Sequence, residues 1–322
     1  MKESLFVKRN ADRWREFELM LEQRNRDRNP DKLATLFVQL TDDLSYARTF
    51  YPGTKTTTYL NSLTTKAHQA IYQRKRERGE RFKEFWMREI PLVMYGARRE
   101  LLLAFVVFAV AILIGIVSTA NDPSFPNSIL GNEYVDMTME NIANGDPMGV
   151  YKSDSQVNMF LRITVNNIFV SLFAFILGGL FSFGTVWLLI KNGLMLGVFH
   201  TFLYDQGALG TSLLAVYVHG TIEISSIVVA GAAGLVMGNS LLFPGTYSRK
   251  VAFVKGAIRG LKIVVGLVPF FIVAGFLESF VTRYTNMPLV VNLGIIGLSL
   301  ALIIGYFLIW PSFAAKKAGE SV

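Results

Sequence analysis

Residues 101–120 read LLLAFVVFAVAILIGIVSTA, twenty residues without a single charged side chain. As an α-helix this run would be about 30 Å long, which is the thickness of the hydrocarbon core of a bilayer. The hundred residues before it are polar, so we do not expect it to be the apolar part of an N-terminal signal peptide. The run therefore predicts the first crossing of an integral membrane protein.

Charge is distributed very unevenly along the chain. Of the 322 residues 52% are apolar and 17% are charged, whereas about a quarter are charged in a soluble domain. Residues 1–100 hold 21 of the 32 Lys and Arg side chains, so the net charge of +8 belongs largely to a polar head in front of an apolar body. The sequence has no cysteine, which excludes disulfides, cysteine-zinc sites and thiol catalysis.

Further uncharged stretches predict an all-α bundle of about six crossings. After residues 101–120 the uncharged stretches cover residues 163–190, 263–277 and 287–309, and the long apolar stretch 211–238 contains His219 and Glu223. Between Lys191 and Asp205 lie thirteen uncharged residues, which is short for a crossing. We expect residues 192–206 to cross as a thin or broken helix, because an even number of crossings keeps Lys191 and the basic residues at 249–259 on one side. A re-entrant segment is the alternative.

The positive-inside rule predicts a multi-pass protein of the inner (plasma) membrane with both termini in the cytoplasm. The loop 121–162 holds six acidic and two basic residues, so we expect it outside. It contains an amphipathic pattern that includes Tyr134 and Ile142. Two uses are open for this loop: a cap over the bundle, or a surface for an extracytoplasmic partner.

The polar head predicts a cytoplasmic helical domain over residues 1–79, followed by a transmembrane domain over residues 100–322. Apolar residues recur at helical spacing in three stretches, separated by Asn29-Pro30-Asp31 and Tyr51-Pro52-Gly53. Three amphipathic helices can bury a shared core. We therefore expect a small helical bundle in front of the membrane.

Residues 80–99 predict an amphipathic helix in the membrane interface, because aromatic and basic side chains come directly before a span. The basic cluster at residues 74–88 can be a solvated helix face, a contact for anionic lipid headgroups, or a nucleic-acid surface. Interspersed glutamates and the lack of a recognition motif argue against nucleic acid. The side chains expected to contact headgroups are Arg81, Lys83, Trp86, Arg88, Arg98 and Arg99.

Glu223 is the most informative residue of the apolar body. An ionisable side chain costs about 2.5 kcal/mol or more at the bilayer centre, so it normally faces protein or water. His219 lies four residues earlier and therefore on the same helical face. Glu278, just after the 263–277 stretch, is a second acid. The other candidates for an intramembrane polar site are His200, Asn166, Asn167 and Asn192.

Several uses of these polar groups are open. They can form hydrogen bonds that fix helix packing, line a path for protons or cations, bind a polar substrate, or serve metal or hydrolase chemistry. The pair His219 and Glu223 matches a zinc motif only in part, because no second histidine lies one turn away. The sequence has no phosphate-binding loop and no nucleophile elbow. We therefore expect no catalytic residues, no cofactor and no metal.

The run His219–Ile224, followed by Val229–Leu235, resembles the core motif of the stage II sporulation protein M family. Residues 274–280 and the stretch 166–193 are similar to other parts of that family, and the opening of the head around Trp14 resembles its longer, non-sporulation members. The resemblance implies a polytopic inner-membrane protein. In spore formers the family helps to remodel septal peptidoglycan during engulfment, alongside a glycan-cleaving enzyme and an amidase.

These observations favour a non-enzymatic membrane component that scaffolds or recruits an envelope complex. Membrane lipids, envelope proteins and a second copy of the chain are the expected partners, and nucleic acid is not. The alternative is a transporter or channel subunit in which Glu223, His219 and Glu278 line a polar path.

Overall fold

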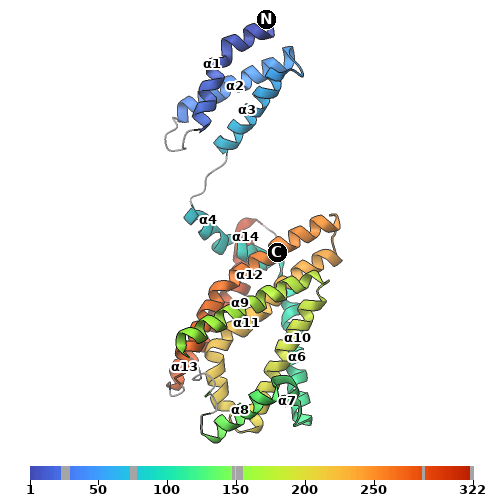
Figure 1. The fold of residues 1–322 in the computed structure, drawn as a ribbon, viewed down its shortest axis with the longest axis vertical. Coiled ribbons are helices and arrows are strands. Elements are labelled where there is room, and N and C mark those ends of the chain that lie inside the picture. The colour runs from blue at the N-terminus through green and yellow to red at the C-terminus, as the bar shows by residue number, and fades with distance from the viewer. Residues whose placement is uncertain (23–29, 73–77, 147–148, 150–154, 285–286, 320–322) are drawn as a thin grey trace. The chain divides into compact units, whose positions relative to one another are not determined.

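The computed structural model describes residues 1–22, 30–72, 78–146, 149, 155–284 and 287–319. Over these residues the chain is almost entirely helical and contains no strand (Figure 1). It divides into two compact units, Met1–Arg81, the head unit, and Phe82–Val322, the membrane unit. The predicted all-α architecture is thus confirmed. Residues 74–77 of the basic cluster lie outside the described residues.

The head unit is built from three amphipathic helices, α1 (Glu3–Glu22), α2 (Pro30–Phe50) and α3 (Lys55–Tyr72). Their apolar stripes meet in one buried core. Its members are Phe6, Trp14, Phe17, Met20, Leu36, Leu40, Leu44, Ala47, Tyr51, Leu60, Leu63 and Ala67. Helices α1 and α2 are also joined by polar contacts, because the carboxylate of Asp43 accepts hydrogen bonds from Arg13 Nη2 (2.5 Å) and Trp14 Nε1 (2.8 Å).

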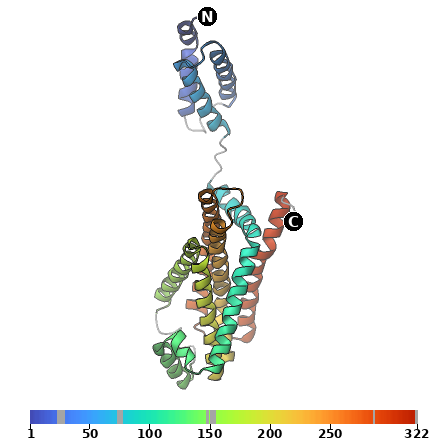
Figure 2. The same ribbon diagram turned by 90° about the vertical axis from the view of Figure 1, so that its right-hand side faces the viewer.

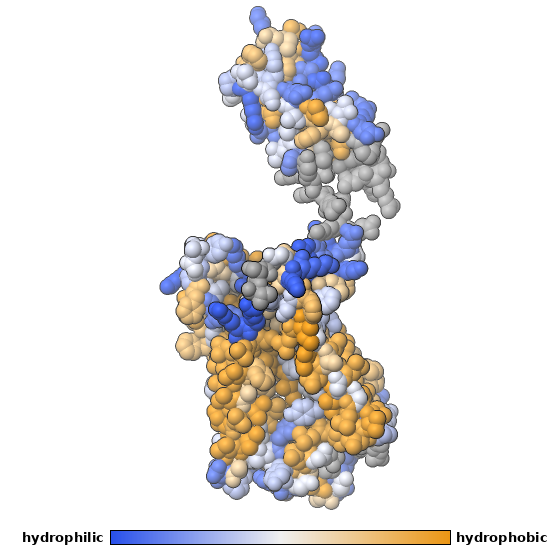
Figure 3. All heavy atoms as spheres, turned by 180° about the vertical axis from the view of Figure 1, so that it is seen from behind, coloured by the Kyte–Doolittle hydropathy of each residue, from blue (hydrophilic) through white to orange (hydrophobic). Residues whose placement is uncertain are grey.

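Six helices among the described residues are long and apolar enough to cross a bilayer, in agreement with the predicted number of crossings. They are α6 (Arg98–Asn121), α9 (Gln156–Ile176), α10 (Phe183–Asp205), α11 (Leu209–Leu242), α12 (Arg249–Phe276), and the helix that begins with α13 (Leu289–Ile304) and runs on to Ala318. Helix α12 continues through a π-helix (Leu277–Val281), and α13 through another (Gly305–Ile309) into α14 (Trp310–Ala318). On the side drawn in Figure 3, apolar residues cover the middle of the membrane unit and hydrophilic residues gather toward its ends.

Residues 192–206 belong to a crossing rather than a re-entrant segment, as predicted, but the expected thin or broken form is wrong, because they are part of the continuous 23-residue helix α10. The chain turns earlier, after α9, where Phe181 and Ser182 have positive φ angles of 51° and 70°. The uncharged stretch 163–190 therefore contains the end of one crossing and the start of the next. Lys191 does not end a helix. Its side chain is exposed on α10, where the aliphatic stem lets the ammonium group reach toward the polar interface.

Glycines let the membrane helices approach each other at backbone distance. A Cβ atom on Gly178, in the turn after α9, would overlap the backbone of Gly234 on α11. A Cβ atom on Gly197 of α10 would overlap the carbonyl oxygen of Ile112 on α6. Between lipid tails no hydrophobic force drives helices together, so such close contacts supply much of the association energy.

The loop 121–162 contains α7 (Phe125–Leu130) and α8 (Asn132–Ala143), and its last residues belong to α9, which begins at Gln156. Figures 1 and 2 both place α7 and α8 at one end of the membrane unit and α14 at the other. Val135 of α8 shares a small buried cluster with residues at the end of α10. Helices α7 and α8 therefore cap the bundle, and the use of the loop as a surface for an extracytoplasmic partner stays a prediction.

The segment before α6 consists of α4 (Arg78–Glu84), a π-helix (Phe85–Glu89) and α5 (Ile90–Gly96). Ile90 and Met94 are buried in the main core of the membrane unit, so α5 is part of the bundle. The side chains predicted to contact headgroups are exposed in the case of Arg81, Lys83, Arg88, Arg98 and Arg99 and half-buried in the case of Trp86. The headgroup contact itself stays a prediction.

Candidate functional site: an intramembrane acid–histidine cluster

Polar side chains of three neighbouring helices meet inside the membrane unit. On α11 they are His219, Glu223 and Ser226, whose spacing of four and three residues puts them on one helical face. His219 and Ser226 are buried, and Glu223 is partly exposed. Helix α11 packs against α9 and α12, and these two helices bring the other polar groups.

The π-helix Leu277–Val281 positions the second acid. Its wide turn closes with a hydrogen bond from the Thr282 N–H to the Leu277 carbonyl (2.8 Å). Such a turn holds one residue more than an α-helical turn, which changes the direction of the side chains that follow, and it is frequent at functional sites. Here it brings both Glu278 and Thr282 to the side chain of His219.

The three titratable side chains His219, Glu223 and Glu278 form one compact group, which we call the acid–histidine cluster. One nitrogen or carboxylate oxygen of each lies within 4.8 Å of the corresponding atoms of the other two. His219 Nε2 is 3.9 Å from Glu278 Oε2, and the two side chains are only 6% and 14% exposed. Two carboxyl groups and an imidazole therefore share one small, mostly buried volume.

A chain of hydrogen bonds fixes the orientation of the His219 ring. The Thr282 hydroxyl donates to the Leu277 carbonyl (3.2 Å), so its oxygen is free to accept from His219 Nδ1 (3.0 Å). The backbone of Ala215 is a second hydrogen-bonding partner of the His219 ring. With the proton of the neutral ring on Nδ1, Nε2 presents its lone pair to Glu278. Three electron-rich groups thus face one another, an arrangement that requires a proton or a cation between them.

Helix α9 adds a stripe of polar side chains to the same interface. Thr164, Asn167 and Ser171 are all buried and recur at helical spacing. Asn167 is a hydrogen-bonding partner of Glu223, yet its amide nitrogen has no hydrogen bond of good geometry within the described residues. The amide group is therefore close to the carboxyl group but incompletely satisfied.

Other polar atoms on these three helices also have no hydrogen-bond partner among the described residues. Buried polar groups are normally paired, so unpaired ones point to a bound water molecule, ion or ligand. The atoms concerned are Thr164 Oγ1, Ser226 Oγ and, on the π-helix that continues α12, Ser279 Oγ.

A cavity of about 380 Å³ opens beside the cluster, where α11 and α13 begin. It is lined by residues of α11, of the segment joining α12 to α13, and of α13, and it includes Thr282. It also includes Asn292, whose Oδ1 is buried and unpartnered among the described residues. Because Thr282 is hydrogen-bonded to His219, the cavity gives an approach to the cluster from one end of the bundle.

Three of the predicted polar residues lie outside the cluster. His200 contacts the ring of Tyr217 (centroids 5.6 Å apart), and Tyr217 lies two residues from His219, hence about 200° around α11. Asn192 donates to a carbonyl of its own helix (2.9 Å). Asn166 is exposed. The structure thus brings together His219, Glu223 and Glu278 with one of the two adjacent asparagines.

Sequence reasoning missed the hydroxyl-bearing side chains of the site. Thr164 and Ser226 could have been found, because each lies at helical spacing from a predicted residue of its own helix. Thr282 also lies four residues after the predicted Glu278, but that spacing does not place either residue beside His219. The approach of Thr282 to His219 depends on the preceding π-helix, and no residue pattern in the sequence predicts that π-helix.

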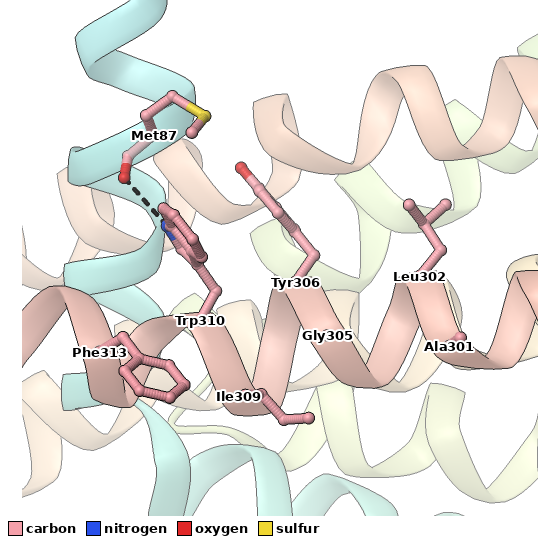
Figure 4. Close-up of a pocket in the computed structure, with 8 residues that line it drawn as sticks. All are labelled: Met87, Ala301, Leu302, Gly305, Tyr306, Ile309, Trp310 and Phe313. Carbon is pink, nitrogen blue, oxygen red and sulfur yellow. Dashed lines mark hydrogen bonds between the residues drawn. The ribbon is translucent and has the colours of Figure 1, made fainter.

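An apolar groove of about 630 Å³ lies elsewhere on the membrane unit, between the π-helix before α5 and the last crossing (Figure 4). Trp310 Nε1 donates to the Met87 carbonyl (3.1 Å), and the Tyr306 hydroxyl donates to the Trp86 carbonyl (2.8 Å). These bonds fasten the segment before α6 to the end of the chain. The groove contains no titratable cluster, so the acid–histidine cluster is the stronger candidate site.

Comparison with known proteins gives matches for both units of the chain. A family model described as stage II sporulation protein M matches residues 104–283, more than half of the chain and all three members of the acid–histidine cluster. A second model, described as a domain of unknown function (DUF8413), matches residues 4–73. Searches of curated proteins and of solved structures returned no significant match.

Proposed function

The chain belongs to the stage II sporulation protein M family, and from this premise we propose that it is a non-enzymatic membrane component that recruits proteins to a bacterial envelope complex. We place it in the inner (plasma) membrane with both termini in the cytoplasm. The first turns of α6 and α12 and the last turn of α14 carry Lys or Arg, and all three lie at the end opposite α7 and α8, which supports this orientation (Figures 1 and 2).

The main support for this proposal is that the chain divides into two compact units, each of which matches a different family model. The head unit buries its own core, so its outer surface is available to a partner while the membrane unit anchors it. The sequence contains no phosphate-binding loop and no nucleophile elbow, which supports a role without catalysis. Envelope proteins, membrane lipids and a second copy of the chain are the proposed partners.

Deleting residues 1–81 is expected to abolish partner retention while the membrane unit stays folded, because the two units have separate cores. The measurement is affinity purification of tagged full-length and truncated protein, at native expression and in mild detergent, with quantitative mass spectrometry. Size-exclusion chromatography of the truncated protein is the control for folding. Recruitment by the head is refuted if the full chain retains no specific partner, or if the truncated chain retains the same set.

A transporter or channel subunit is the second candidate, and the acid–histidine cluster is the observation that favours it. Ionisable groups in a membrane interior commonly mark ion or proton paths. The cluster also has an approach from one end through the cavity at Thr282. In this proposal the cluster is an intermediate binding site for a proton or a cation that crosses the membrane.

Glu223→Gln is then expected to reduce proton or cation flux into reconstituted vesicles to the level of protein-free vesicles, because it removes one carboxylate without changing the side-chain volume. Glu100→Gln is the matched control, since Glu100 lies at the start of α6 and its carboxylate accepts from Asn239 rather than joining the cluster. Unchanged flux in a correctly folded Glu223→Gln variant eliminates this candidate.

A further inference from the structure

We propose that His219, Glu223 and Glu278 bind one divalent transition-metal cation, with Zn²⁺ as the best-fitting ion. This site goes beyond the recruiting function, which requires no ion. The sequence indicated no metal because His219 and Glu223 lack a third ligand nearby in the chain. The structure supplies that ligand from the π-helix after α12, where Glu278 faces the same histidine.

The donor set selects the class of ion. One imidazole nitrogen and two carboxylates suit Zn²⁺ and related first-row divalent cations, whereas Mg²⁺ and Ca²⁺ prefer oxygen ligands only. With metal–ligand bonds of about 2.1 Å, two ligand atoms of a tetrahedral site are roughly 3.4 Å apart. The three atoms already lie within 4.8 Å of one another, so small side-chain rotations complete the geometry.

The surroundings of His219 match those of a metal-binding histidine. Such a histidine usually gives its other ring N–H to an outer-shell acceptor, which fixes the tautomer and aims the free nitrogen at the metal. Thr282 is in that position, because its hydroxyl is committed to the Leu277 carbonyl and its oxygen accepts from Nδ1. The other ring nitrogen, Nε2, lies 3.9 Å from Glu278 Oε2.

The polar atoms around the cluster give an independent indication of a ligand. Asn167 is 4% exposed and its side chain faces Glu223, but its amide nitrogen makes no hydrogen bond of good geometry within the described residues. Ser279 is fully buried next to Glu278, and its Oγ is likewise unpartnered there. A metal-bound water molecule, whose oxygen can accept from an N–H or O–H donor, would satisfy such groups.

The charge balance also favours a cation. Two carboxylates a few ångströms apart in a poorly hydrated interior repel each other strongly unless a proton or a cation lies between them. Among the described residues, His219 is the one basic side chain that forms an ion pair with either acid. A divalent cation neutralises both carboxylates at once, and the neutral imidazole completes its coordination.

The test is a titration of purified full-length protein in mild detergent with ZnCl₂, after removal of bound metal with a chelator. Isothermal calorimetry and elemental analysis are expected to give one Zn²⁺ per chain. Glu278→Gln and Glu223→Gln are expected to weaken binding by roughly 100-fold or more, since even the loss of an outer-shell partner costs about 10–100-fold. Thr282→Val removes that partner and keeps the side-chain shape, so about 10–100-fold is expected for it.

His200→Ala is the matched control, because His200 is a partly buried histidine that lies away from the cluster, and it is expected to leave Zn²⁺ binding unchanged. Variants are compared only when their size-exclusion profiles match that of the unaltered chain. The proposal is overturned if the unaltered chain takes up no stoichiometric Zn²⁺. In that case only protons would neutralise the cluster. The proposal is equally overturned if the folded glutamine variants bind Zn²⁺ as tightly as the unaltered chain.

Discussion

Gly197→Ala is expected to destabilise the membrane unit strongly. The new Cβ atom would overlap the carbonyl oxygen of Ile112 on α6, which is backbone and cannot move aside as a side chain can. A Cβ atom on Gly115 of α6 would likewise overlap the backbone of α10. Neither helix therefore has room for an added methyl group at this contact. Overpacking of this kind costs about 1–3 kcal/mol and more where backbone must shift.

The expected result is a melting temperature in detergent that is lower by roughly 2–12 °C, taking about 2–4 °C per kcal/mol for a unit of this size. Gly297→Ala is the matched control, because Gly297 lies in α13 with no atom within 4 Å of its Cβ position. There the helix propensity of alanine predicts a gain of about 0.5–1 kcal/mol. Equal melting temperatures for the two variants would show that α6 and α10 do not touch as described.

Asp43→Ala is expected to destabilise the head unit by about 2–3 kcal/mol. Its carboxylate accepts from Trp14 Nε1, and the Trp14 side chain is 4% exposed, so the substitution leaves a buried N–H without a partner. The substitution also removes the ion pair between Asp43 and Arg13. Because the Arg13 side chain is 35% exposed, the loss of this pair contributes less to the destabilisation than the loss of the Trp14 hydrogen bond. A buried donor left unpaired costs more than the bond itself contributes.

Asp42→Ala is the control for this change, because Asp42 is the preceding residue of the same helix and is exposed. We expect it to change stability by no more than about 0.5 kcal/mol. The measurement is urea unfolding of residues 1–81, followed by the fluorescence of Trp14, the single tryptophan in that fragment. If both variants unfold at the same urea concentration, the contact between Asp43 and Trp14 does not stabilise the head unit.

The sequence predicted the membrane architecture well because the physical signals are local. A run of twenty uncharged residues such as 101–120 has few stable solutions other than a spanning helix. The same reasoning failed at residues 163–206, where it placed the helix boundary at Lys191. Exposed lysines are tolerated along a membrane helix because their stems extend to the interface. The actual boundary depends on Phe181 and Ser182, which have a left-handed backbone conformation. Their residue types do not predict this conformation.

In the candidate site, too, local patterns were predictable from the sequence and contacts between separate helices were not. Helical periodicity alone predicted that His219 and Glu223 lie on one face of a helix. The energetic cost of placing a charge in the membrane indicated that they belong to a polar site. Periodicity cannot say which of two adjacent asparagines points inward, and the structure selects Asn167 while Asn166 is exposed. That choice depends on how α9 packs against its neighbours.

By itself, then, the sequence determined that this chain crosses a membrane about six times as helices, and that Glu223 and His219 lie together. Both follow from interactions within one helix or between one helix and lipid. Only the tertiary structure decided that Glu278 and Thr282 complete the cluster, because their approach requires a π-helix in one crossing and the glycine-mediated packing of separate crossings. Contacts between distant segments depend on backbone geometry and on packing, which a single sequence does not specify residue by residue.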